Sequence, residues 1–198
     1  GAQEGDTERE LHSRIVQGCI SQGAEIVHGL LNVSRNNQIY LGEGDTALAK
    51  GDVIRTDYVS YYSGYPGHQS RTFVVGQPSS EQQETYRRYR DVHRMVIDKC
   101  RPGIRANEIY QLADAALFEL GFGHAGSMVG HSIGPWFHQQ EPLLIPNCDT
   151  KIEEGMVLAL EPYALYWHLQ DLVHVTKDGP KLLSGLFDTD ALFVIGSD

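Results

Sequence analysis

The chain has 198 residues, 41% of them apolar and 21% charged, which is typical of a globular protein with one domain spanning residues 1–198. Its net charge of −10 argues against nucleic acid or an anionic membrane surface as the main partner. The three cysteines are too scattered for a disulfide scaffold, and no apolar run of about 18 residues predicts a transmembrane helix. The first residues do not resemble a signal peptide, and these features together favour a cytoplasmic protein.

A helix is expected first. Thr7 and Glu10 form a capping box, in which each side chain binds a backbone N–H at the start of a helix. The apolar spacing that follows predicts that this helix covers residues 7–29. After a turn, residues 38–41 are expected to form a short strand.

The central part of the chain predicts a hairpin and two long helices. Residues 53–62 are rich in β-branched and aromatic side chains and predict a strand, and residues 69–75 predict its hairpin partner across a turn at 63–67. Ser79 and Ser80 open a helix that Pro102 and Gly103 stop. The later elements expected are a helix at 107–120, a loop at 143–154, and strands at 157–163 and 169–176. This order predicts an α+β domain whose mostly antiparallel sheet carries helices on one face.

Residues 129–142 contain two histidines on a short segment rich in glycine and apolar residues. Glycines flank His131 and let backbone approach its ring closely, and His138 follows seven residues later. Trp136 and Phe137 predict that the segment is buried. The segment is a candidate functional site, and a glycine-rich turn with two core histidines is the alternative.

Polar and ionisable groups interrupt otherwise apolar strands. Five apolar residues lead directly into Glu161, Asp57 lies inside the strand predicted at 53–62, and Gln170 precedes another apolar run. A buried carboxylate is costly unless a cation faces it. Glu161 is therefore expected either to bind a metal or to pair with Arg55 or Arg71.

In order and spacing, these segments resemble the pita-bread metallopeptidases, which include methionine aminopeptidase, aminopeptidase P, prolidase and creatinase. The matching motifs are Gly51-Asp52 with Asp57, Gly64-Tyr65 with Arg71-Thr72-Phe73, Pro102-Gly103, Gly130-His131-Ser132-Ile133-Gly134 with His138, Gly155-Met156 with Glu161-Pro162, and Asp171 with Val175-Thr176 and Asp178-Gly179-Pro180. The resemblance implies a pita-bread fold, a curved antiparallel sheet built from two pseudo-twofold αβ halves. It also implies a homodimer.

The resemblance implies a metal site with two altered ligands. In the family, five residues hold two divalent ions, and the matching positions here are Asp57, His131, Glu161, His68 and Gln170. His68 and Gln170 replace the two carboxylates that bridge the ions. An imidazole offers one lone pair and an amide oxygen carries no charge, so neither bridges two cations well.

A single ion is therefore expected, Zn²⁺, Mn²⁺ or Fe²⁺, held by His68, His131 and Glu161 with Asp57 or Gln170 as a further ligand. Complete loss of the metal, as in creatinase, is the alternative. If these replacements serve new chemistry, changing His68 to Asp together with Gln170 to Glu should add a second ion and abolish the native activity.

The remaining site residues are also implied by the resemblance. His138 matches the family histidine that contacts substrate or stabilises the reacting carbonyl, and Asp57 or His131 is expected to act as acid or base. Glu141 and Tyr65 are further candidates for substrate binding. The family often has another histidine ahead of the Gly51-Asp52 turn, but none lies between His28 and His68.

Other histidines receive no role from the sequence. His12, His28 and His93 fall on predicted helices and are expected at the surface or the edge of the core, and nothing assigns a function to His168 or His174.

The expected activity is hydrolysis of an amide or other C–N bond in a small amino-acid-derived substrate or a short peptide. The alternatives are a metal-free, creatinase-like hydrolase and an inactive pita-bread binding module. The module would need a docking surface, for which residues 86–94 supply a cluster of arginines and tyrosines. A solvated helix surface or a dimer contact is the favoured interpretation of these residues.

Overall fold

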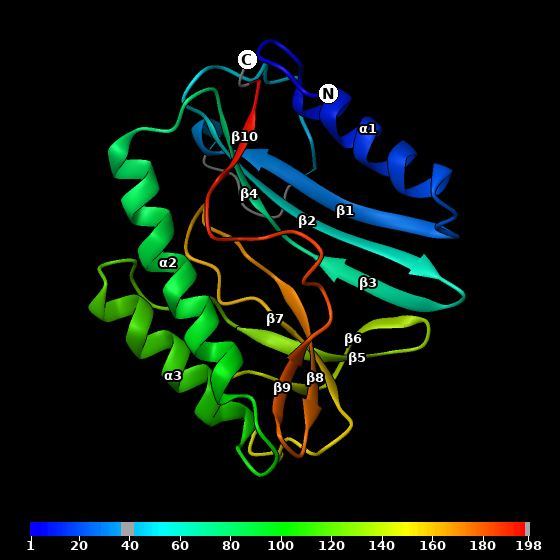
Figure 1. Cartoon of the computed structure of the whole chain (residues 1–198), viewed down its shortest axis with the longest axis vertical. Helices are drawn as coiled ribbons and strands as arrows, with labels where there is room; N and C mark the ends of the chain where they lie inside the picture. The colour runs from blue at the N-terminus through cyan, green and yellow to red at the C-terminus, as the bar shows by residue number, and fades with distance from the viewer. Residues whose placement is uncertain (37–41, 197–198) are drawn as a thin grey trace.

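The structure is a computed structural model, and it describes residues 1–36 and 42–196. Figure 1 shows two helix-and-sheet halves, with the N-terminus at the far end of the first half. Within the described part of the chain, no helix is long and apolar enough to cross a membrane.

The described elements, in chain order, are α1 (Glu8–Ser21), β1 (Ile26–Val33), the 3₁₀ helix η1 (Ser34–Asn36), β2 (Val53–Tyr62), β3 (Tyr65–Gln69), β4 (Thr72–Val75), α2 (Ser80–Lys99), α3 (Ala106–Glu119), β5 (Gly130–Gly134), β6 (Phe137–Leu143), β7 (Val157–Leu160), β8 (Asp171–Thr176), β9 (Gly179–Leu182) and β10 (Phe193–Ile195).

The first half is a sheet with the strand order β1-β2-β4-β10, in which β3 also pairs with β2. Its strands are antiparallel except for the parallel pair β4 and β10. Helix α1 packs on this sheet, and the core between them is formed by Leu11, Leu31, Val33, Leu48, Ile54, Tyr58, Val75 and Ile195.

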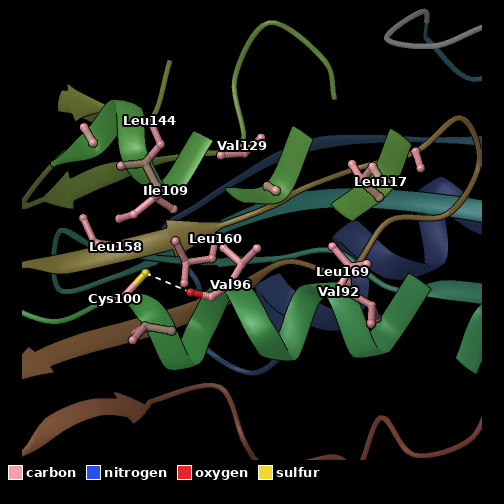
Figure 2. Close-up of a cluster of buried hydrophobic side chains, with 14 of the residues drawn as sticks. Val92, Val96, Cys100, Ile109, Leu117, Val129, Leu144, Leu158, Leu160 and Leu169 are labelled. Atoms are coloured by element: carbon pink, nitrogen blue, oxygen red, sulfur yellow. Dashed lines mark hydrogen bonds between the residues drawn. The ribbon is translucent and has the colours of Figure 1, made fainter. Parts of the chain in front are cut away.

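The second half is a fully antiparallel sheet with the order β6-β5-β7-β8-β9. Helices α2 and α3 pack against each other beside this sheet and enclose a larger apolar core (Figure 2). Burying these side chains stabilises the fold because it removes apolar surface from water. The predicted α+β class with mostly antiparallel strands is confirmed.

A backbone bridge joins the two sheets between Ser70 and Gln170. The N–H of Gln170 donates to the carbonyl oxygen of Ser70 over 3.1 Å, and the N–H of Ser70 donates back to Gln170 over 3.4 Å. Ser70 directly follows β3 and Gln170 directly precedes β8. The bridge therefore brings the end of β3 next to the side chains that surround β7 and β8.

The helix expected at 7–29 is wrong in its second part. The capping box is present, but α1 ends at Ser21 and is followed by Gly23, whose φ of +97° suits glycine and not a continuing helix. Ile26–Val33 is strand β1, paired residue by residue with β2. Pairing with β2 therefore outweighs the helical spacing of the apolar residues in this segment. The strand expected at 38–41 lies outside the described residues.

The hairpin is confirmed, with one correction. Its first strand spans Val53–Tyr62 as expected, but the second is divided into β3 and β4, because Ser70 leaves the first sheet to pair with Gln170. The helices expected after Ser79 and at 107–120 are confirmed as α2 and α3.

The expected burial of residues 129–142 is only partly right. His131 is buried, but Trp136 and Phe137 are 57% and 64% exposed at the tip of the β5–β6 hairpin.

Candidate metal centre

A cavity of about 270 Å³ lies where the two halves meet. Strands β1, β2 and β3 supply one wall, and the other is supplied by the segment before β5, by β5 and β6, and by the residues that follow β7. The lining residues are His28, Gly29, Leu30, Asp57, Val59, His68, Ser127, Met128, His131, His138, Gln139, Glu161 and Tyr163. Four histidines and two carboxylates among them make this cavity the candidate functional site.

His68, His131 and Glu161 meet at the base of the cavity. Each is buried, and each offers a ligand atom within 4.8 Å of the other two. Ligand atoms around one ion with bonds of about 2.1 Å lie at most about 4.2 Å apart. The cluster can therefore close around a single ion with a small movement of side chains.

The hydrogen bond of His131 leaves one ring nitrogen available. Its Nδ1 lies 3.0 Å from the carbonyl oxygen of Ser132, which can only accept, so Nδ1 carries the proton. Nε2 then presents a lone pair 3.6 Å from Oε1 of Glu161. Burial lowers the pKa of His131 to about 4, which keeps the imidazole neutral at pH 7 as a metal ligand must be.

Both ring nitrogens of His68 already have partners. Nδ1 lies 3.1 Å from the amide nitrogen of Gln170, and Nε2 lies 2.9 Å from Oδ1 of Asp57. Burial favours the neutral form of Asp57, but the hydrogen bond from His68 and the neighbouring imidazoles outweigh it and lower the pKa of Asp57. To bind an ion, His68 has to exchange one of these hydrogen bonds for coordination.

Gln170 acts as an amide clamp between the halves. Its oxygen accepts from the Ser70 hydroxyl over 2.9 Å, and its nitrogen donates to Oε2 of Glu161 over 3.0 Å as well as to His68. Gln170 therefore turns its amide nitrogen toward His68 and Glu161, and not the oxygen that a metal ligand would present.

Glu161 occupies an environment that disfavours its charge. Burial, together with the nearby charge of Asp57, raises its pKa to about 8, and Arg55 acts in the opposite direction. Pairing with Arg71 is wrong, because Arg71 instead contacts Oδ1 of Asp171 over 2.7 Å. A cation bound at Oε1 would remove this penalty, so the donor set fits a divalent ion.

His138 lines the upper cavity wall beside His28, with ring centroids 4.8 Å apart. Burial, then the neighbouring His68 and His28, lower the pKa of His138 to about 4. His28 is exposed, as expected, but the helix predicted for it is wrong, because β1 carries it to the cavity. It therefore supplies a histidine ahead of the Gly51-Asp52 turn, which the sequence reading did not find.

Two expected substrate-binding residues do not line the cavity. Tyr65 begins β3 and is 65% exposed. Glu141 is exposed on β6, where its carboxylate accepts from the backbone N–H of Leu143 over 3.0 Å. Their role in substrate binding remains a prediction from the resemblance.

Two further histidines are buried. His93, expected at the surface or the edge of the core, is 1% exposed and donates from Nε2 to the carbonyl oxygen of Leu160 over 3.2 Å. His168, which had no expected role, is fully buried behind Glu161 with its Nε2 3.6 Å from Oε2. The only signal in the sequence was its position two residues before Gln170.

Among residues 86–94 of α2, the tyrosines pack into the core and arginines form ion pairs with nearby carboxylates. Tyr86 and Tyr89 lie in the second core, while Arg87 pairs with Glu84 and Arg94 with Asp190. These contacts support the interpretation as a solvated helix.

Comparison with known proteins gives a decisive match to the chain. The model of metallopeptidase family M24 matches residues 1–177. The chain belongs to metallopeptidase family M24. The resemblance to the pita-bread metallopeptidases is thereby confirmed.

Relatives and solved structures agree with this family. The chain is 28% identical to an Xaa-Pro dipeptidase of Pyrococcus horikoshii, over 91% of this chain and 54% of the relative. It superposes on the prolidase of the same organism with a TM-score of 0.83 at 26% identity, covering 92% of this chain and 55% of that one.

An X-Pro aminopeptidase from Thermotoga maritima gives a TM-score of 0.89 at 22% identity, covering 98% of this chain and 56% of that one, and it shows the shared fold. The pita-bread fold is confirmed. The M24 chain spans about half the length of the curated relatives that it matches.

Proposed function

We propose that this M24 chain carries the catalytic site of a peptidase-type hydrolase that uses one divalent ion, Zn²⁺, Mn²⁺ or Fe²⁺. Its substrates would be short peptides or small amino-acid derivatives with an amide or other C–N bond. The names of the relatives make Xaa-Pro dipeptides the first substrates to test.

The observation that carries the proposal is the buried group formed by His68, His131 and Glu161 at the base of the cavity. Two imidazoles and one carboxylate suit Zn²⁺, Mn²⁺ or Fe²⁺ with open positions. Asp57 and Glu161 are the only acidic side chains among its lining residues. Two divalent ions would therefore repel each other with too little compensation, which favours one ion.

The residues of the chain divide the chemistry among them. A bound divalent ion supplies a Lewis acid for the scissile carbonyl and acidifies water. His138 is neutral at pH 7 and can donate a hydrogen bond to the oxygen that gains charge during attack. Asp57 is held ionised by His68 and is positioned to accept a proton at the cavity wall.

Metal content and turnover test the proposal together. Protein purified without chelator should contain about one ion per chain, and hydrolysis of an Xaa-Pro dipeptide should stop with EDTA and return with one equivalent of Zn²⁺, Mn²⁺ or Fe²⁺. Glu161→Gln should lose both the ion and the activity. Metal content far below one ion per chain after incubation with all three ions would contradict the single-ion site. A content near two ions per chain would contradict the inference that His68 and Gln170 prevent binding of a second ion.

A metal-free hydrolase is the second candidate, because Asp57 and Gln170 already engage both ring nitrogens of His68. In that case the histidines move protons and Glu161 holds a cationic group of the substrate. Turnover that is unchanged by EDTA distinguishes this candidate from the first.

An inactive binding module is the third possibility, and alanine substitutions of His131 and Glu161 separate it from both enzymes. A biological activity that survives these two substitutions does not depend on the site. A homodimer, a cytoplasmic location and the lack of nucleic-acid or membrane partners remain predictions from the sequence.

A further inference from the structure

His168 lies between β7 and β8 and is completely buried. The side-chain Nε of Arg55, on β2, lies 3.2 Å from its Nδ1. A guanidinium carries only donors, so Nδ1 of His168 must accept this hydrogen bond. A neutral imidazole with a lone pair on Nδ1 carries its proton on Nε2. The contact with Arg55 therefore fixes the tautomer of His168.

The backbone and ring of His168 are held in place from several sides. Its N–H donates to Oγ1 of Thr72 over 2.9 Å, and the hydroxyl of Thr72 donates back to its carbonyl oxygen over 3.1 Å. The ring of Tyr163 meets the imidazole edge to face at 5.7 Å and also lies 5.1 Å below the guanidinium of Arg55. The direction of Nε2 is thus set by the fold.

That direction leads to Glu161. Nε2 of His168 makes no hydrogen bond within the described part of the chain, and Oε2 of Glu161 lies 3.6 Å from it. The amide nitrogen of Gln170 donates to the same oxygen over 3.0 Å. Two N–H groups are therefore aimed at Oε2, while Oε1 faces the lone pair of His131 over 3.6 Å.

We propose that His168 is a positioning residue for the metal centre: Arg55 holds it as the Nε2–H tautomer, and this N–H directs Oε2 of Glu161 so that Oε1 faces His131. This inference rests on the proposed single-ion site. Outer-shell donors of this kind fix the orientation of a ligand, and their loss typically lowers metal affinity by about 10- to 100-fold.

Two amide substitutions test the donor nitrogen and the acceptor nitrogen of His168 one at a time. In His168→Gln the amide nitrogen can reach the place of Nε2 and donate to Glu161. In His168→Asn the shorter amide reaches only the place of Nδ1 and can still accept from Arg55. The Zn²⁺ dissociation constant, measured by competition with a chromogenic chelator, should rise about tenfold in His168→Asn and less than about threefold in His168→Gln.

His93→Gln is the matched control, because His93 is equally buried in the second half but contacts Leu160 and not the side chain of Glu161. It should lose folding stability and keep the wild-type Zn²⁺ affinity. Equal affinities in His168→Gln and His168→Asn, with both proteins folded, would overturn the inference, because a purely structural role does not depend on which nitrogen is replaced.

The tautomer itself is tested without any metal. Nitrogen NMR of metal-free protein labelled at histidine should show His168 protonated at Nε2 and unprotonated at Nδ1, and this signal should change in Arg55→Met. A proton on Nδ1 would refute the inference even in a protein that binds no ion. If wild-type protein binds no Zn²⁺ while the Nε2–H tautomer is present, the proposed metal function fails and the orientation of His168 toward Glu161 stands.

Discussion

The two halves of the molecule support the same cavity with unequal cores. Among the described residues, the buried cluster of the first half has eight members and that of the second half has eighteen, so the second half can hold a side chain more rigidly. The first half contributes His28, which is exposed, and Asp57, which is partly buried. The second half contributes His131 and Glu161, which are 1% and 4% exposed.

This difference separates two tasks within one site. Deep burial in the second half removes water from both side chains, and it lowers the pKa of His131 to about 4 and raises that of Glu161 to about 8. The first half leaves His28 and Asp57 closer to solvent. The altered residue His68 is the exception, because it comes from the first half and is buried against the second.

The largest expected effect concerns the two cores. Leu158 and Leu31 are both fully buried strand residues, one in each half. Leu158→Ala should lower the free energy of unfolding by about 4–5 kcal/mol and Leu31→Ala by about 2–3 kcal/mol, because a larger enclosed core relaxes less around a cavity. Urea denaturation measures both. Equal losses would show that the first half is as tightly packed as the second.

The next effect is a pH dependence that comes from Glu161. Its pKa is about 8 in the folded, metal-free protein and near its ordinary value when unfolded, so folding favours the protonated acid. Its contribution to stability is therefore complete below about pH 4.5 and is lost as the pH rises toward 8, by an amount on the order of a few kcal/mol.

Chemical denaturation of EDTA-treated protein from pH 5 to pH 8 measures this loss. Glu161→Gln is the matched control, since a side chain that stays neutral should remove the decline. Added Zn²⁺ should restore stability at pH 8 in wild type only. A decline of the same size in Glu161→Gln would assign the pH dependence to another group.

A smaller effect distinguishes the two histidines of the cluster. His131→Ala should weaken Zn²⁺ binding by about 100-fold, whereas His68→Ala should weaken it by about tenfold, because His68 must first give up a hydrogen bond to Asp57 or Gln170. Competition titrations give both constants. A larger loss for His68→Ala would make the first half the principal source of ligands.

The smallest effect in free energy changes the number of ions. His68→Asp together with Gln170→Glu replaces the amide clamp with a carboxylate about 3 Å from Oε2 of Glu161, and the added negative charge favours a second cation. The double variant should bind two ions per chain and lose about tenfold or more of the native turnover, the range for a disturbed metal shell. One ion with unchanged turnover would show that these positions do not determine the metal count.

The sequence allowed prediction of the parts that depend on local pattern. The capping box of Thr7 and Glu10, the strand Val53–Tyr62, helices α2 and α3, and the burial of Glu161 follow from spacing and from the cost of a buried charge. The resemblance to the pita-bread metallopeptidases pointed to His68, His131 and Glu161, and the structure places them together.

The missed features depend on contacts between distant segments. His28 reaches the cavity because β2 recruits Ile26–Val33 as a strand, although the same residues continue the helical spacing of α1. The partners of His68 are 11 and 102 residues away, and Arg55 and His168 are 113 residues apart. No local pattern encodes such pairs.

The sequence by itself therefore determined the family, the α+β class and which side chains are candidates for the site, because residue type and periodicity are local properties. Only the tertiary structure decided which nitrogen of His168 carries a proton and which oxygen of Glu161 remains open. Arg55 reaches His168 from the first sheet, and Gln170 donates to Oε2 of Glu161. Inside a buried site, geometry selects among donors and acceptors because an unmatched polar atom is costly.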